Sequence, residues 1–284
     1  MNLICIPALK CHKDNLAINI ENLLNFINKN EILIVTPDVD DYKDFQFKGF
    51  NVKADNYFSD ISKSEIKSFL NPEKKFLNSW YYQQFLKYSI VTKCSEYSNV
   101  IIIDADSIIL NDRVLKNNLI FLNTTEYHKP YFTTIKNLFP SVKCLNRSAI
   151  NNFQNFNREV LMEMLCKIEK IKDEKWYLYL IGQINDSHDI RAFSEYETYA
   201  NYSFSFHNHQ LQNLKIFRRA DLINLYISKD SIIKLFKNTS FDIIGFEINH
   251  NIKMLHRLYG IFWLIIVILK KYEKNIFSKL KSNK

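Results

Sequence analysis

The sequence predicts an α/β fold, with a mixed, mainly parallel central sheet flanked by helices and a basic amphipathic helix at the C-terminal end. The first observation is a βαβ pattern: short apolar runs at residues 3–6 and 31–36, with helical spacing of apolar residues between them at 14–28. A βαβ unit implies parallel strands joined by a right-handed crossover. The second observation is the run Val-Ile-Ile-Ile at 100–103, which is typical of a strand buried on both faces.

Composition and charge limit the class of protein. With 284 residues, 47% of them hydrophobic, the chain can bury a sizeable core and is not disordered. The net charge is +8, but from Lys253 onward eight Lys and Arg residues stand against Glu273 alone. A nucleic-acid-binding protein would spread basic residues around its groove. We therefore expect no nucleic-acid partner, a domain at 1–250 and a basic C-terminal segment at 251–284.

Cysteine and glycine usage exclude several kinds of site. The five cysteines are scattered and form no CxxC pair, which favours a reducing compartment over a disulfide or zinc framework. The first residues lack the basic region and long apolar run of a signal peptide, so we expect a cytoplasmic protein. None of the four glycines forms a GxG or P-loop pattern, which excludes a glycine-rich phosphate cradle of either kind.

The helices before the central strand follow from apolar spacing and capping residues. Asp14 is expected to cap the first helix, and a weak helix at 57–70 is expected to stop at Asn71-Pro72. A stronger helix at 79–95, capped by Ser79, carries on one face Trp80, Gln84, Lys87 and Val91. This mixed face can line a ligand pocket, or it belongs to a partly buried helix whose lysine extends to solvent.

Two acids follow the central strand directly. Asp104 and Asp106 flank Ala105, and alternation along the backbone points both acids to the same side. Open α/β sheets bind ligands at this end of their strands, and paired carboxylates suit Mg²⁺ or Mn²⁺ shared with substrate phosphates. The alternative is a solvated turn, although the apolar run at 108–110 means that the pair interrupts core sequence.

Loops after the first two strands should open at the same edge of the sheet as Asp104. Lys10, His12 and Asp38 lie in these loops. They are candidate nucleotide contacts, and equally they can be ordinary loop residues.

The second half of the chain predicts one more strand and several helices. The strand is expected at 119–122, and helices are expected from Tyr131, at 158–171, around 176–181 and at 193–202. In the last helix Ser194 and Glu197 form a capping-box pattern, which alone could account for Glu197.

An acid-and-tyrosine set marks the helix at 193–202. Glu195, Tyr196, Tyr199 and Tyr202 combine a carboxylate with amphipathic rings, a mixture typical of sugar-binding surfaces. Glu195 is also simply favoured in the first turn of a helix by the dipole. His207 and His209 follow, and the pair can supply a metal or phosphate contact or be structural.

The C-terminal segment has an uncharged apolar stretch at 258–269 with basic flanks. As a helix it spans about 18 Å, against roughly 30 Å of bilayer hydrocarbon. Such a segment fits a helix lying in the interface of an anionic membrane, and residues 253–284 are therefore expected to bind that surface. The alternative is a buried terminal helix with a solvated basic end.

Three stretches together resemble a family of bacterial glycosyltransferases, most of them uncharacterised, with the GT-A fold. They are Trp80-Tyr-Tyr-Gln83-Gln84-Phe-Leu-Lys87, Ile103-Asp104-Ala-Asp106-Ser107 and Phe193-Ser-Glu195-Tyr-Glu197-Thr-Tyr199. The resemblance covers about residues 1–225. The chain departs from the family at 148–161, where Asn152 and Phe153 stand at positions that often carry histidines.

The resemblance implies a Rossmann-like GT-A domain that transfers sugar from a nucleotide-diphosphate sugar, with a UDP-sugar favoured, to a saccharide or lipid-linked hydroxyl. It implies Mn²⁺ or Mg²⁺ at Asp104 and Asp106. His207 and His209, from their spacing alone, are further metal candidates. Glu195 is the expected base of an inverting reaction and Glu197 the second choice. The expected acceptor contacts are Tyr196, Tyr199 and His128. The expected donor contacts are Pro7, Lys10, Asp38, Trp80, Gln83, Gln84, Lys87, Asp104, Ala105 and Asp106.

The family and the basic segment place the expected reaction in bacterial surface polysaccharide or lipooligosaccharide synthesis, peripheral on the inner face of the cytoplasmic membrane. Two other functions fit parts of the sequence. A haloacid-dehalogenase-like phosphohydrolase would use Asp104 as its nucleophile, although its motif usually lies near the chain start. A non-catalytic peripheral membrane protein would need only the C-terminal segment.

Overall fold

The computed structural model describes residues 2–116, 119–122, 127–207, 209–237, 239–246 and 260–268. The chain divides into two compact units. Unit 1 comprises Met1–Lys13, Ile27–Asp104 and Leu115–Asn213, and unit 2 comprises Asp14–Phe26, Ala105–Val114 and Leu214–Lys284. The boundary expected at residues 250 and 251 lies outside the described residues.

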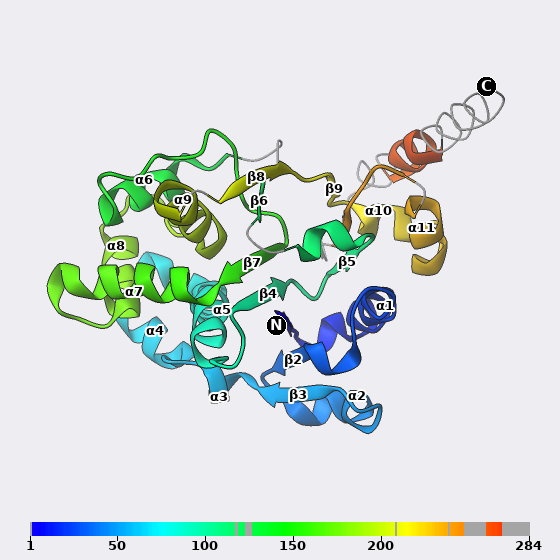
Figure 1. Ribbon diagram of the computed structural model, residues 1–284, viewed down its shortest axis with the longest axis horizontal. Coiled ribbons are helices and arrows are strands. Elements are labelled where there is room, and N and C mark those ends of the chain that lie inside the picture. The colour runs from blue at the N-terminus through cyan, green and yellow to red at the C-terminus, as the bar shows by residue number, and fades with distance from the viewer. Residues whose placement is uncertain are drawn as a thin grey trace. The chain divides into compact units, whose positions relative to one another are not determined.

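Unit 1 is built on a five-stranded sheet of order β3-β2-β1-β4-β7 (Figure 1). The strands are β1 (Asn2–Pro7), β2 (Ile32–Thr36), β3 (Asn51–Ala54), β4 (Asn99–Ile103) and β7 (Phe153–Asn157). The first four are parallel, with Ile4 opposite both Ile32 and Ile101, and β7 pairs antiparallel with β4. This arrangement confirms the predicted class, a mixed and mainly parallel sheet flanked by helices.

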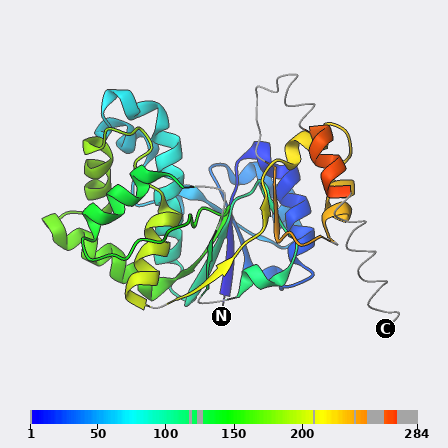
Figure 2. The ribbon, with the colours of Figure 1, turned by 90° about the horizontal axis from the view of Figure 1, so that it is seen from above.

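Alternation along the strands buries side chains on both faces of this sheet, and one large cluster covers one of these faces. Leu3, Leu33 and Val100, from three neighbouring strands, share one buried cluster with residues of the long helices. The long helices of this cluster are α5 (Asn78–Lys93), α7 (Arg158–Lys172), α8 (Trp176–Asp186) and α9 (Glu195–His207). Figure 2 shows these helices gathered on one side of the strands.

Shorter elements complete unit 1. The helices are α2 (Lys43–Phe47), α3 (Asp55–Phe58), α4 (Lys63–Phe69) and α6 (Lys129–Leu138), and the 3-10 turns are Lys10–His12, Lys29–Glu31, Val39–Tyr42 and Pro72–Leu77. The strand expected at 119–122 is β6 (Leu119–Leu122); it pairs with β8 (Gln210–Asn213) in a separate two-stranded sheet.

The expected helix boundaries and caps need correction. The helix expected at 57–70 is two helices, α3 and α4, interrupted at 59–62, because Ser62 caps α4 and forms a capping box with Glu65. Asp14 and Ser79 are not caps: α1 (Lys13–Leu23) and α5 both begin before them, each directly after a 3-10 turn. The Tyr131 helix likewise begins two residues earlier, at Lys129.

Unit 2 is smaller and contains a three-stranded sheet of order β5-β10-β9, formed by β5 (Ser107–Ile109), β9 (Ile216–Phe217) and β10 (Ile243–Gly245). Most of α1, together with α10 (Ala220–Asn224), α11 (Lys229–Phe236) and a helix at 260–268, belongs to this unit. The 3-10 turn Asp112–Leu115 follows β5. Across the described part of the chain, no helix is both long and apolar enough to pass through a bilayer.

Candidate active site at the carboxyl edge of the sheet

The parallel strands of unit 1 end at one common edge. β1 ends at Pro7 and β2 at Thr36, and the backbone N–H of Ala8 donates to Val35 O at 2.8 Å. Asp104 follows the end of β4, and its N–H donates to Asn152 O at 2.8 Å. The structure thus brings Pro7, Asp38 and Asp104 to the edge where α/β sheets bind ligands.

A buried polar cluster forms beside Asp104. The ammonium of Lys87, on α5, lies 2.7 Å from Glu195 Oε1, 2.8 Å from Asp104 Oδ1 and 2.9 Å from the Tyr196 hydroxyl. The Tyr196 hydroxyl in turn donates to Asp104 Oδ1 at 3.1 Å. We call Lys87, Asp104, Glu195 and Tyr196 the Lys87 cluster. A lysine has three N–H donors, and here each has an acceptor.

Burial sets the electrostatics of this cluster. The Lys87 and Glu195 side chains are 5% and 6% exposed, whereas Asp104 is 24% exposed. Burial opposes charge on Lys87, but Asp104 and Glu195 outweigh it and hold the lysine pKa above its usual value. Burial also raises the pKa of Glu195, and the neighbouring Lys87 only partly offsets this. The cluster contains one cation and two acids, so its net charge is negative. Asp104 is the charged member most exposed to solvent.

Helix α5 also holds the start of α9. The Gln84 side-chain oxygen accepts from the Glu195 backbone N–H at 3.1 Å, and the Tyr88 hydroxyl donates to Glu195 O at 2.8 Å. Trp80, one turn earlier, lies 5.9 Å from the Arg191 guanidinium. The predicted face of α5 is therefore mainly internal: Gln84 and Lys87 are buried and fix Glu195, while Gln83 is exposed.

The remaining predicted donor residues lie on the surface or in unit 2. Lys10 is well exposed and pairs with Asp41 at 2.7 Å, and Asp38 caps the turn Val39–Tyr42. Ala105 and Asp106 belong to unit 2, where Asp106 O accepts from the Phe246 N–H at 2.7 Å.

Two predicted residues of α9 are buried away from solvent. The Glu197 carboxylate accepts from the Ser148 hydroxyl and, at 3.1 Å, from the Ala149 N–H, so it secures the loop before β7. Half of the expected capping box is present, since the Ser194 hydroxyl accepts from the Glu197 N–H at 3.4 Å. Tyr199 is fully buried in the core, and its hydroxyl accepts from the Asn157 N–H at 2.7 Å.

The predicted histidines lie elsewhere in unit 1. His207 ends α9, about 18 Å along the helix from Glu195, and its Nε2 lies 3.2 Å from Glu163 Oε2. His209 Nδ1 contacts the Ser203 hydroxyl. His128 precedes α6, and its Nε2 lies 2.9 Å from Arg191 O. Within the described residues, no group of three or more His, Cys, Asp or Glu side chains is arranged to hold a metal ion.

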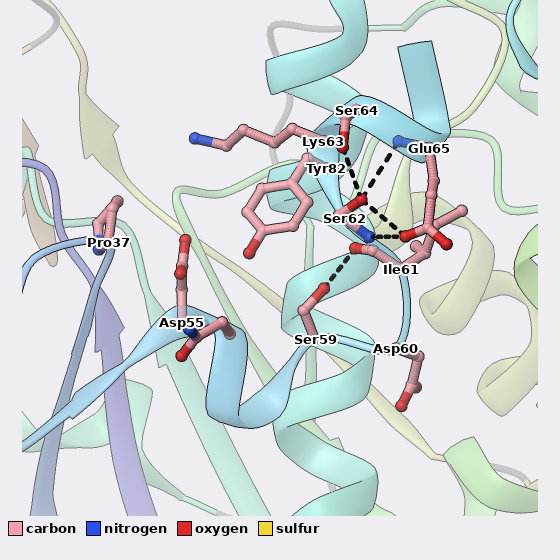
Figure 3. Close-up of a pocket in the computed structure, with 11 residues that line it drawn as sticks. Pro37, Asp55, Ser59, Asp60, Ile61, Ser62, Lys63, Ser64, Glu65 and Tyr82 are labelled. Atoms are coloured by element: carbon pink, nitrogen blue, oxygen red, sulfur yellow. Dashed lines mark hydrogen bonds between the residues drawn. The ribbon is translucent and has the colours of Figure 1, made fainter. Parts of the chain in front are cut away.

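A pocket of 580 Å³, which the sequence did not reveal, lies beyond the ends of β2 and β3 (Figure 3). Pro37 and Asp55 form one side, and the segment from Ser59 to Glu65, with Tyr82, forms the other. The segment that separates α3 from α4 forms part of the pocket wall. A single continuous helix at 57–70 would therefore not form this pocket. The signal was present in the Ser62-to-Glu65 capping pattern.

Comparison with known proteins gives structural similarities only. No protein-family model matches the chain, and no curated protein matches it. The apo form of mouse xyloside xylosyltransferase 1 is similar with a TM-score of 0.49 and 9% identity, over 89% of this chain and 100% of that chain. An active-site mutant of LgtC gives a TM-score of 0.48 and 11% identity, over 88% of each chain. The bifunctional glycosyltransferase WbbM gives 0.40 and 10%, over 87% of this chain and 46% of that chain.

These TM-scores all lie below 0.5, so the fold class rests on the sheet topology described above. That topology and the Lys87 cluster define the chain as a mixed α/β protein with a charged site at the carboxyl edge of its sheet.

Proposed function

We propose that this chain is a metal-dependent glycosyltransferase of GT-A-like fold. It would move a sugar from a nucleotide-diphosphate sugar, with a UDP-sugar favoured, to a hydroxyl of a saccharide or glycolipid in bacterial surface polysaccharide or lipooligosaccharide synthesis. The supporting observation is the Lys87 cluster, because its four residues come from all three stretches that resemble such enzymes: Lys87 from the first, Asp104 from the second, and Glu195 and Tyr196 from the third. Lys87 and Glu195 are 108 positions apart in sequence, yet they form a direct ion pair.

The edge of the sheet offers a path for an extended donor. The pocket beside Asp55 has a volume typical of small-molecule sites. β3 and β4 are separated by β2 and β1, so their ends lie about 14 Å apart at the usual strand spacing. A nucleotide diphosphate can bridge such a span, with its nucleoside in the pocket and its phosphates near Asp104.

Asp104 has the chemistry that a divalent cation requires. Lys87 and Tyr196 both bond its Oδ1, which leaves Oδ2 of this partly exposed carboxylate for Mg²⁺ or Mn²⁺. Asp106 would be the second ligand, as the sequence suggests. When bound, the metal would neutralise the diphosphate leaving group. Because Lys87 pairs with both Asp104 and Glu195, its proposed role is to neutralise and position these two acids.

Glu195 is the proposed base for the acceptor hydroxyl in an inverting transfer. Lys87 donates a hydrogen bond to Glu195 Oε1. We therefore expect Oε2 to accept the proton of the acceptor hydroxyl. Burial raises the carboxyl pKa, which brings it closer to neutrality and favours proton uptake.

The test is a thermal-shift screen of nucleotides and UDP-sugars, with and without Mn²⁺. A ligand that binds the folded state raises Tm as its concentration exceeds Kd. We expect a UDP-sugar to stabilise the protein only when Mn²⁺ is present, and incubation with an acceptor glycan to release UDP. If no sugar nucleotide shifts Tm under either condition, the proposal is wrong.

A further inference from the structure

The helix at 260–268 has two chemically different sides. One side packs into unit 2: Val267 is 1% exposed, and the Trp263 ring centre lies 5.5 Å from that of Phe217. Gly260 lies against α10, so close that a Cβ at this position would sit 2.6 Å from Leu222 O. For residues 260–268, the packing of this side agrees with the alternative raised from the sequence, a buried terminal helix.

The opposite side is apolar and exposed. Phe262 is 56% and Ile265 51% exposed, and Ile261 and Ile268 are exposed as well. Residues 261, 265 and 268 follow helical spacing and form one stripe. We call Ile261, Phe262, Ile265 and Ile268 the apolar stripe. Scattered single apolar residues need no explanation, whereas a contiguous set marks an interaction surface.

The charge of the neighbouring sequence indicates the partner. From Lys253 onward, eight Lys and Arg residues stand against Glu273, and Lys270 and Lys271 directly follow the apolar stretch. A second copy of this chain would bring two such cationic segments together and be repelled. An anionic bilayer offers negative headgroups to the lysines and acyl chains to the stripe, which is the pairing that interfacial amphipathic helices use.

We infer that the apolar stripe is a docking surface for an anionic lipid bilayer, with the helix at 260–268 lying in the plane of the interface. Phe262 and Ile265 enter the boundary between headgroups and acyl chains, while Val267 and Trp263 stay in the protein. This surface would place the protein peripherally on the inner, anionic face of the cytoplasmic membrane. The inference is independent of the proposed glycosyl transfer.

The experiment is co-sedimentation of the full chain with vesicles, either of phosphatidylcholine alone or with 30% phosphatidylglycerol. We expect binding only to the anionic vesicles, weakening with added salt because the lysine contribution is screened. Phe262→Ser combined with Ile265→Ser should reduce the bound fraction at least tenfold. The matched control is Phe47→Ser, which removes an exposed phenylalanine of unit 1 and should bind like the unmodified protein.

A fluorescence measurement separates insertion from simple charge attraction. Phe262→Trp should give a blue shift with anionic vesicles, and Phe47→Trp should give none. Wild-type-like vesicle binding by the Phe262→Ser, Ile265→Ser variant would overturn the inference, as would equal binding to neutral vesicles. So would a self-association in sedimentation velocity that the same double variant abolishes, because the stripe would then bind a second copy.

Discussion

The ammonium of Lys87 lies 2.7 Å from Glu195 Oε1, and both side chains are almost fully withdrawn from solvent. A buried ion pair recovers little net stability, because the interaction mainly offsets the cost of desolvating two charges. Its retention at the edge of the sheet, next to the more exposed Asp104, is better explained by positioning. The pair fixes α5 to the start of α9 and orients the acids that the proposed reaction uses.

Replacing one partner of this pair should be costly. Lys87→Met would leave two neighbouring carboxylates without their cation, and we expect a loss of about 3–5 kcal/mol in the free energy of unfolding, the range for a broken buried pair. Urea denaturation measures this loss.

The double variant Lys87→Met, Glu195→Gln serves as the control, because it removes both buried charges. It should regain most of the stability lost in the single variant while remaining inactive. If Lys87→Met alone unfolds like the unmodified protein, the ion pair is not formed in solution.

The two acids of Asp104-Ala105-Asp106, the DAD stretch, should govern donor binding through the metal. Asp104→Asn keeps the shape of the side chain but removes the charge, and we expect it to abolish the Mn²⁺-dependent Tm increase produced by a UDP-sugar; Asp106→Asn should do the same. Asp112→Asn, an acid of the same segment outside the pair, is the control and should retain the increase. Unchanged UDP-sugar affinity in either DAD variant would contradict the metal assignment.

The pocket between α3 and α4 should recognise the nucleoside part of the donor. Burial raises the pKa of Tyr82 to about 12, so its hydroxyl remains a hydrogen-bond donor at neutral pH. Tyr82→Phe removes only this hydroxyl and should weaken UDP binding about fivefold, corresponding to roughly 1 kcal/mol for one hydrogen bond. The control is Thr133→Val, in a second pocket, which is lined by residues of α6 and of the segment 183–189; it should leave UDP binding unchanged in calorimetry.

Sequence patterns predicted the parts of the fold that depend on residues close together in the sequence. The βαβ start and the helix at 158–171 have clear periodicity, and they appear close to the expected bounds. β7 was not predicted, because its Gln154 and Asn155 are poor strand residues on local preference. They are nevertheless buried, and β7 is a strand because it pairs with β4.

The candidate site shows the same difference between local sequence patterns, which could be predicted, and long-range contacts, which could not. Asp104 could be found from its place after a buried strand, and Glu195 from its helix start. Their joint pairing with Lys87 was not evident, because a contact over 108 residues leaves no local pattern. Glu197 and Tyr199 resembled site residues by composition, but their hydrogen bonds to Ala149 and Asn157 depend on the tertiary fold.

Stability should fall as the solution becomes acidic. Burial, and to a lesser extent the neighbouring His207, lowers the pKa of His209, so below about pH 6.5 the unfolded state binds more protons than the folded state. The contribution of His209 is therefore fully present at pH 7.5 and is lost as pH falls through its unfolded pKa. Between pH 7.5 and 5.5, Tm of His209→Asn should decrease less than that of the unmodified protein.

Two glycines in helices should respond to alanine in opposite directions. Gly182 lies in α8, and a Cβ there would meet no atom within 4 Å. Gly182→Ala should therefore raise the free energy of unfolding by about 0.5–1 kcal/mol through helix propensity alone. At Gly260 the new Cβ would sit 2.6 Å from Leu222 O and 3.1 Å from the Tyr226 ring. The backbone oxygen cannot move aside without shifting α10.

Gly260→Ala should consequently destabilise the protein by about 1–3 kcal/mol, the usual cost of overpacking, despite the same gain in helix propensity. Urea denaturation followed by tryptophan fluorescence, to which Trp263 contributes through a ring that contacts Phe217, would detect the loss. Equal stabilisation by both alanines would mean that the helix at 260–268 does not pack on α10. The buried side of that helix would then be free in solution, and the distinction between its packed side and the apolar stripe would fail with it.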